Sequence, residues 1–326
     1  MIGRAAEATA RSRAYDLFGR LFAGGPTAGL LPTVHAIPDL AASLPATLDT
    51  DHAAAAHQHL FGFNVFPHES IFLGAGSELG GPVADGVRAF YRRAGYRADA
   101  SLPAGDHLAG ELGLLAFLAS AEADAWEDGE TGHAERIRAL QRDFLDLHLL
   151  RWLPPLVQAI RQQAEPFYRA LAGLTQDLAL DHRSRLGDDL LAPAAPFYLP
   201  PLPDLLADKR TGLRDIATHL LTPAYSGLYL SRDDIARLAR SGHLPRGFGE
   251  RRQMLTNLLR SAAEYDSLPR LLADVGLLVG GWRGAYRAFG EQGLPAATGI
   301  AAVWLERLAA TEALLDQVSR ATLASP

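Results

Sequence analysis

Two short stretches of this sequence gather polar residues that are suited to acid–base chemistry or to binding a charged partner. Asp106 and His107 stand together before an apolar run, with Glu111 one helical turn further on, and Glu69-Ser70 forms the earlier stretch. A carboxylate at a helix start accepts hydrogen bonds from backbone amides, while a neighbouring imidazole changes its charge near neutral pH. Taken alone, such a pair is usually a structural cap. As a functional pair, it would face an incoming peptide.

The same residues allow an enzymatic alternative, a hydrolase or metal enzyme centred on Asp106 and His107 with Glu69 and Glu111 nearby. Common signatures of such enzymes are missing, because the chain has no Gly-x-Ser-x-Gly elbow, no His-Glu-x-x-His helix and no Walker loop. There is also no cysteine, so only His, Asp and Glu are available to hold a metal ion. We therefore predict a protein without catalytic activity, metal or cofactor.

Three histidines, His52, His57 and His59, stand close together in the sequence and raise the question of a metal site. His52 and His59 are two helical turns apart, which places them on one face of a helix. No third or fourth ligand is evident nearby, which favours solvent-exposed histidines. The glycine-rich segment 74–80 is interpreted as a mobile loop, because its spacing does not match a dinucleotide fingerprint.

Composition and charge exclude several classes of protein. The chain has 326 residues, of which 48% are hydrophobic and 21% charged, so it can form a globular fold with a sizeable core. Residues 1–203 carry 16 basic and 24 acidic side chains, whereas residues 204–326 carry 15 and 13. The charge of the first part repels nucleic acid and attracts basic partners. Since no run approaches the ~20 apolar residues of a membrane span and no signal-like segment is present, we expect a cytoplasmic protein.

An acidic run extends over 122–135. Such a run is usually a solvated face. Its functional interpretation is a negative patch that guides an arginine-bearing peptide by long-range attraction, which raises the association rate and weakens with salt. The run consists of Glu122, Asp124, Glu127, Asp128, Glu130 and Glu135.

Apolar residues recur mainly at helical spacing and period-two alternation is nearly absent, so the sequence predicts an all-α fold. Pro154-Pro155 should stop or redirect one helix, because proline lacks an amide donor and clashes with the preceding turn. Ser231 followed by Asp234 suits a helix start. Helices are expected over 14–22, 83–91, 108–125, 134–152, 156–180, 213–221, 231–240, 251–263, 268–279 and 296–318.

Repeated prolines up to Pro203 interrupt the helical pattern and mark a domain boundary. We predict a helical domain over 1–182, a proline-rich strap or linker over 183–203 and a smaller helical domain over 204–326. Flexible linkers avoid aromatic residues. Phe197 and Tyr198 therefore indicate a strap that lies on a surface.

Short motifs follow one another in a set order over about residues 10–165. Glu69-Ser70 comes after a proline, Val87 and Tyr91 lie on the next predicted helix, and Asp-His-Leu-x-x-Glu-Leu opens a long apolar helix at Asp106. The segment 144–154, Phe-Leu-Asp-Leu-His-Leu-Leu-Arg-Trp-Leu-Pro, comes last. In order and spacing these motifs resemble the TorD/DmsD/NarJ family of chaperones. The chain departs from the family pattern at Pro103, which stands three residues before Asp106 and not two, and at His68, where an aromatic residue is common.

The resemblance implies that residues 1–182 form a TorD-like helical bundle of a cytoplasmic chaperone for the maturation of a molybdopterin-dependent oxidoreductase. Such a chaperone binds the twin-arginine signal peptide of the precursor and keeps the apo-subunit competent until its cofactor is inserted. By position, Asp106 and His107 match the family's peptide-binding pair, Glu111 lies one turn into the helix, and Glu69 and Ser70 match the earlier motif. The implied receptor is an apolar groove with a negative rim.

Residues 204–326 exceed the ordinary family length and carry no motif that we recognise. The sequence leaves open whether they hold the client enzyme, form a homodimer or shield the groove, and whether a guanine nucleotide binds. Residues 231–259 also suit two helices around a turn, as in helix-turn-helix DNA binders. The small positive charge of this half argues against that regulatory alternative.

Overall fold

The computed structural model describes residues 3–45, 47–76, 78–98, 105–187, 196–205, 211–245 and 247–323. Within these ranges the protein consists of helices joined by turns, with one isolated antiparallel β-bridge between His68 and His107 and no strand. The predicted all-α class is confirmed. Pro103, Ser77 of the glycine-rich segment and residues 188–195 of the predicted strap lie outside the described residues.

The elements in chain order are α1 (Arg4–Gly24), α2 (Leu31–His35), α3 (Pro38–Ser43), α4 (Thr50–His57), the π-helix η1 (Gln58–Asn64), α5 (Glu69–Leu73), α6 (Gly81–Ala94), α7 (Leu108–Glu127), α8 (Thr131–Phe144), the π-helix η2 (Leu145–Leu149), α9 (Leu150–Arg161), α10 (Pro166–Leu186), α11 (Leu213–Leu221), α12 (Pro223–Ser226), α13 (Arg232–Ser241), α14 (Arg251–Glu264), α15 (Leu268–Gly290) and α16 (Pro295–Leu323).

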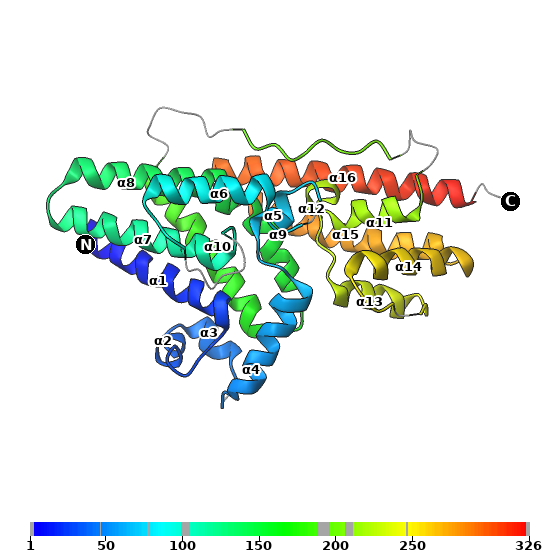
Figure 1. The fold of residues 1–326 in the computed structure, drawn as a ribbon, viewed down its shortest axis with the longest axis horizontal. Coiled ribbons are helices and arrows are strands. Elements are labelled where there is room, and N and C mark those ends of the chain that lie inside the picture. Colours follow the sequence, from blue (N-terminus) through cyan, green and yellow to red (C-terminus); the bar gives the residue numbers. More distant parts are fainter. Residues whose placement is uncertain are drawn as a thin grey trace.

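The helices form an elongated body (Figure 1). Helices α1, α7 and α8 lie at one end, shown on the left, and the ends of α14 and α16 lie at the other. In the middle, α9 packs against α10 on one side and against α15 and α16 on another. Helix α9 therefore joins the first half of the chain to the second.

Helix α7 carries one of the predicted site residues, Glu111, and is enclosed by its neighbours. Leu108, Leu112 and Leu115 recur every three to four residues and are fully buried, because α1 and α8 both pack along this helix. The approach of α1 is close: a side chain at Gly19 would meet the carbonyl oxygen of Ala109 at 3.3 Å. Glu111 therefore projects into the interior of the bundle.

The expected break at Pro154-Pro155 is wrong, because both prolines lie inside α9. In a regular helix the N–H of residue 155 would donate to the carbonyl of Arg151, and proline has no N–H to donate. In this fold Trp304 of α16 donates its Nε1–H to that carbonyl at 2.9 Å. The wider π-turn η2 precedes the prolines. The helical structure is interrupted instead after Arg161, the last residue of α9, and resumes at Pro166, the first residue of α10.

The described part of the strap lies against α16. Arg307 donates to the carbonyls of Leu199 and Pro200 at 3.2 and 2.8 Å, and the Phe197 ring lies 6.2 Å from that of Trp304. Leu199 is buried, whereas Tyr198 is exposed. None of the helices in the described ranges is long and apolar enough to cross a membrane.

Candidate functional site

The two polar stretches singled out in the sequence meet in the structure. Leu108 N–H donates to the carbonyl of Pro67 at 2.9 Å, and Glu69 N–H donates to the carbonyl of Asp106 at 3.0 Å. Ser70 N–H donates to Oδ2 of Asp106 at 2.8 Å. Asp106 therefore caps the start of α5 and not the start of α7, the helix that follows it in the chain.

His107 is the residue that caps α7. Its Nδ1 accepts a hydrogen bond from Ala109 N–H at 3.1 Å, and its ring lies edge-on to that of His68 at 4.8 Å. Burial, together with the neighbouring His68, lowers the pKa of His107 to about 3. His107 is thus neutral at physiological pH, and the expectation of a charge change near neutral pH is wrong for this histidine.

Asp106 stays ionised although it is fully buried. Burial raises its pKa, but the neighbouring His68 and the hydrogen bond from Ser70 outweigh that effect and leave the pKa below the ordinary value of 3.8. Nδ1 of His68 lies 3.6 Å from Oδ1 of Asp106. His68, the residue that departs from the family pattern, therefore lies between Asp106 and His107 and contacts both.

Glu69 and Glu111 form a second buried group together with two residues of the last motif. Trp152 Nε1–H donates to Oε2 of Glu111 at 3.1 Å, and Nδ1 of His148 lies 3.1 Å from Oε2 of Glu69. Burial, followed by the charge of Glu69, raises the pKa of Glu111 well above its ordinary value of 4.5. Both effects favour the protonated, neutral form of Glu111 in the folded protein.

The raised pKa of Glu111 makes stability depend on pH. An acid with a raised pKa in the folded state takes up a proton on folding at pH values between its unfolded and its folded pKa, so its contribution to stability is lost as pH rises from about 4.5 through that window. Glu111→Gln removes that requirement and keeps an acceptor for Trp152. We expect the variant to gain stability over wild type by about 1.4 kcal/mol per pH unit over this window. Urea unfolding at several pH values between 5 and 8 measures the difference.

Glu127→Gln is the matched control, since Glu127 lies on the same helix and is exposed. Its stability should differ from that of wild type by less than about 0.5 kcal/mol, and this difference should stay constant between pH 5 and 8. A constant difference between Glu111→Gln and wild type across the whole range would show that Glu111 is not protonated in the folded protein.

All five predicted peptide-binding residues lie in the interior. Asp106, His107, Glu111, Glu69 and Ser70 are each at most 7% exposed. The sequence predicted the Asp-His pair at the rim of a groove, but the pair is buried where the starts of α5 and α7 meet. A peptide reaches these side chains only if those helices separate. The sequence did not indicate that His148 contacts Glu69 or that Trp152 contacts Glu111. The available signal was that each of these two carboxylates, in apolar surroundings, needs a hydrogen-bond donor.

The acidic run divides into a structural and an exposed part. Glu122 is buried and accepts from Arg11 at 2.9 Å and from Arg138 at 3.2 Å, so it belongs to the core and not to a solvated face. Glu135 lies within 3.7 Å of Arg4. The exposed residues around the turn from α7 to α8 are Asp124, Glu127, Asp128 and Glu130.

The three clustered histidines do not converge. His57 is only partly exposed, contrary to expectation, and its Nε2 lies 2.9 Å from the carbonyl oxygen of Phe22. His59 lies 3.0 Å from Asp233 of the second half. Nowhere in the part of the chain that the structure describes do three His, Asp or Glu side chains come together as metal ligands do.

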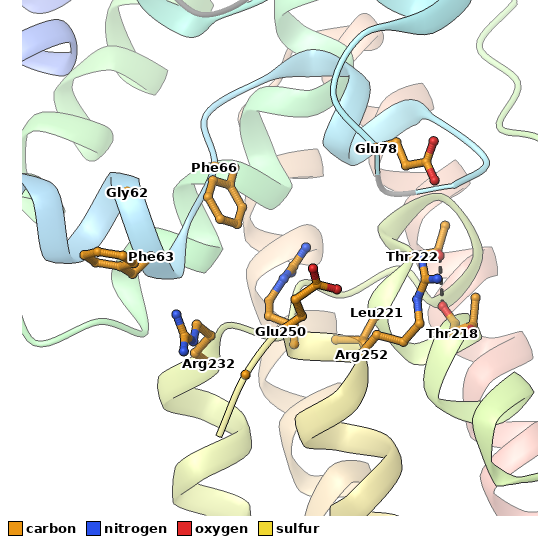
Figure 2. A pocket seen from close by; sticks show the side chains of 12 residues that line it. Gly62, Phe63, Phe66, Glu78, Thr218, Leu221, Thr222, Arg232, Glu250 and Arg252 are labelled. Atoms are coloured by element: carbon orange, nitrogen blue, oxygen red, sulfur yellow. Dashed lines mark hydrogen bonds between the residues drawn. The ribbon is translucent and has the colours of Figure 1, made fainter. Parts of the chain in front are cut away.

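A cavity of about 640 Å³ opens elsewhere, between the two halves of the chain (Figure 2). One wall comes from η1 and the segments after it, and the other from α11 and the first residues of α13 and α14. The sequence analysis did not anticipate it. The lining residues are Gly62, Phe63, Phe66, Glu78, Thr218, Leu221, Thr222, Arg232, Gly249, Glu250, Arg251 and Arg252.

Comparison with known proteins identifies one part of the chain. Residues 27–158 match the family described as nitrate reductase delta subunit, which confirms the resemblance for the stretch that contains the motifs. The chain is 40% identical over 83 residues to the selenate reductase assembly chaperone protein of Thauera selenatis, and 41% identical over 83 residues to the chlorate reductase assembly chaperone protein of Ideonella dechloratans. Each match covers 26% of this chain and 42% of the relative.

Proposed function

We propose, from the premise that residues 27–158 belong to the nitrate reductase delta subunit family, that this protein is a cytoplasmic chaperone for the assembly of a molybdopterin-dependent oxidoreductase. In this role it binds the twin-arginine signal peptide and the apo-subunit of its client until the cofactor is inserted. It is not an enzyme.

One observation carries the proposal: the motif segments of the matched stretch meet at a single place. Asp106 reaches Ser70, Glu69 reaches His148, and Glu111 reaches Trp152, although the partners are 36 to 79 residues apart in the chain. The two relatives bear the names of reductase assembly chaperones. Because the motifs that resemble the family form one interior network, we infer that this chain has the architecture of the family and, through it, the role of its members.

We assign a positioning role to the five buried residues. Asp106 and Ser70 fix the start of α5, and His107 fixes the start of α7. Glu69 and Glu111 tie these two helices to η2 and α9. In this proposal the network holds the helices that form the peptide-binding surface, and the peptide does not contact it while the bundle is closed.

The arginines of the signal peptide are proposed to meet the exposed acidic turn between α7 and α8. Asp124, Glu127 and Asp128 lie in the last turn of α7 or directly after it. Acidic side chains are unfavourable at a helix C-terminus, where the backbone dipole is already negative, and no basic residue lies in that last turn. A cluster of like charges that costs stability is well suited to a basic partner.

Calorimetry with a synthetic twin-arginine signal peptide tests this proposal. We expect heat of binding at low salt and about tenfold weaker binding at raised salt, because exposed charges are screened. A variant that combines Asp124→Asn, Glu127→Gln, Asp128→Asn and Glu130→Gln should bind more weakly and lose most of the salt dependence. These side chains are exposed, so the variant should fold.

A peptide with both arginines replaced by glutamine is the control and should bind as weakly as the variant. Absence of heat at low salt would exclude signal-peptide binding. The wider role has its own test, deletion of the gene in its host: normal cofactor content of every molybdopterin oxidoreductase in the deletion strain would exclude the chaperone function.

A further inference from the structure

The cavity between the two halves is lined by charged groups that have no partner among the residues that the structure describes. Arg232 and Arg252 line it, and neither makes a hydrogen bond or ion pair with any residue that the structure describes. Arg251 differs, because it donates to the carbonyl of Leu230 at 3.0 Å and lies over the rings of Phe66 and Tyr229. Two guanidinium groups are therefore available to a ligand, and a guanidinium suits a carboxylate.

The positions of these charges limit the shape of the ligand. Arg232 lies on the side of the cavity near Phe63, and Arg252 lies on the side near Thr222 (Figure 2). Two carboxylates also line the cavity: Glu250 lies between the two arginines, and Glu78 lies on the side of Thr222; neither makes an ion pair with a described residue. A compact anion in the middle of the cavity would meet Glu250. An elongated ligand with separate acidic groups at its two ends avoids it.

Apolar side chains extend the site beyond the cavity. Phe63 in the wall is 47% exposed, and Leu79 and Phe248, the neighbours of lining residues in the chain, are 53% and 87% exposed. Exposed apolar groups of this size around a polar cavity are typical of protein-interaction sites. The ligand should thus be longer than the cavity and partly apolar.

We propose that the cavity is a docking site for an extended peptide segment that carries acidic side chains on both sides of an apolar one. The acidic groups pair with Arg232 and Arg252, and the apolar side chain packs on Phe63 and Phe66. Residues after 204 supply both unpaired arginines, which gives this part of the chain a function. The inference goes beyond the chaperone proposal, because the cavity is lined by none of the five residues of the network around Asp106 and selects the opposite charge from a twin-arginine peptide.

Fluorescence anisotropy with a labelled synthetic peptide, with Glu-Phe-Glu between Gly-Ser flanks, tests the proposal on the full chain. We expect saturable binding that weakens with salt, and at least about tenfold weaker binding by the Arg232→Gln and Arg252→Gln double variant. Phe63→Ala should also weaken it. Arg260→Gln is the matched control: Arg260 is exposed on α14, outside the cavity, and should leave binding unchanged.

Several results would overturn this inference. Equal binding of a Gln-Phe-Gln peptide would show that charge is not recognised, and wild-type affinity of the double variant would place the site elsewhere. Succinate that binds as tightly as the peptide and displaces it would make the cavity a small-anion site. Dimerisation that the double variant abolishes would make it an interface between two copies. Each outcome is independent of the signal-peptide experiment, so the two proposals fail separately.

Discussion

We expect Asp106→Ala to lower the free energy of unfolding by about 3–5 kcal/mol. Its carboxylate is fully buried and accepts from Ser70 N–H, with His68 on its other oxygen. Removing it leaves the buried Ser70 N–H and His68 Nδ1 without this carboxylate. Urea unfolding followed by circular dichroism measures the loss. Asp106→Asn, which keeps an acceptor, should lose only about 1–2 kcal/mol.

Asp128→Ala is the control for this experiment, since Asp128 is exposed and should change stability by less than about 0.5 kcal/mol. If Asp106→Ala were equally harmless, the cap on α5 would not hold the two segments together. The folded Asp106→Asn variant also tests the positioning role, because it should bind the signal peptide several-fold more weakly. Unchanged peptide affinity would make the network purely structural.

We expect Trp304→Ala to destabilise the protein by about 3–5 kcal/mol, chiefly by loosening the second half from the first. Trp304 is fully buried, stacks on Tyr286 with ring centroids 5.9 Å apart, and donates to the carbonyl of Arg151. The substitution therefore leaves a cavity where α16 meets α9. Urea unfolding gives the size of the loss, and limited proteolysis should cut the variant faster than wild type between α10 and α11.

Trp304→Phe separates the contribution of packing from that of the hydrogen bond, because phenylalanine retains most of the packing and lacks the Nε1–H. This variant should lose about 1–2 kcal/mol of stability. Leu277→Ala on the neighbouring α15 is the control, since Leu277 is 77% exposed. A Trp304→Ala protein as stable and as protease-resistant as Leu277→Ala would contradict the view that this tryptophan joins the two halves.

Much of the helical structure could be predicted from the sequence, because apolar spacing reports the buried face of a helix wherever that helix packs. The range 213–221 agrees with α11, and 251–263 agrees with α14 to one residue. The helix start expected at Ser231 is confirmed, and there Ser231 and Asp234 form a capping box, whose partners are three residues apart. The helix break expected at Pro154-Pro155 is wrong because the donor to the Arg151 carbonyl comes from residue 304, far away in the sequence.

The motifs that relate residues 27–158 to a family, and the all-α class, follow from the sequence alone, because residue order and periodicity are local properties of the chain. Only the tertiary structure decided that Asp106 caps α5, that Glu111 is enclosed with Trp152, and that Arg232 and Arg252 share a cavity with Phe63. These relations depend on how segments far apart in the sequence pack together. The charge of each ionisable group depends on its burial and on its neighbours in the fold, and neither can be predicted from a local sequence pattern.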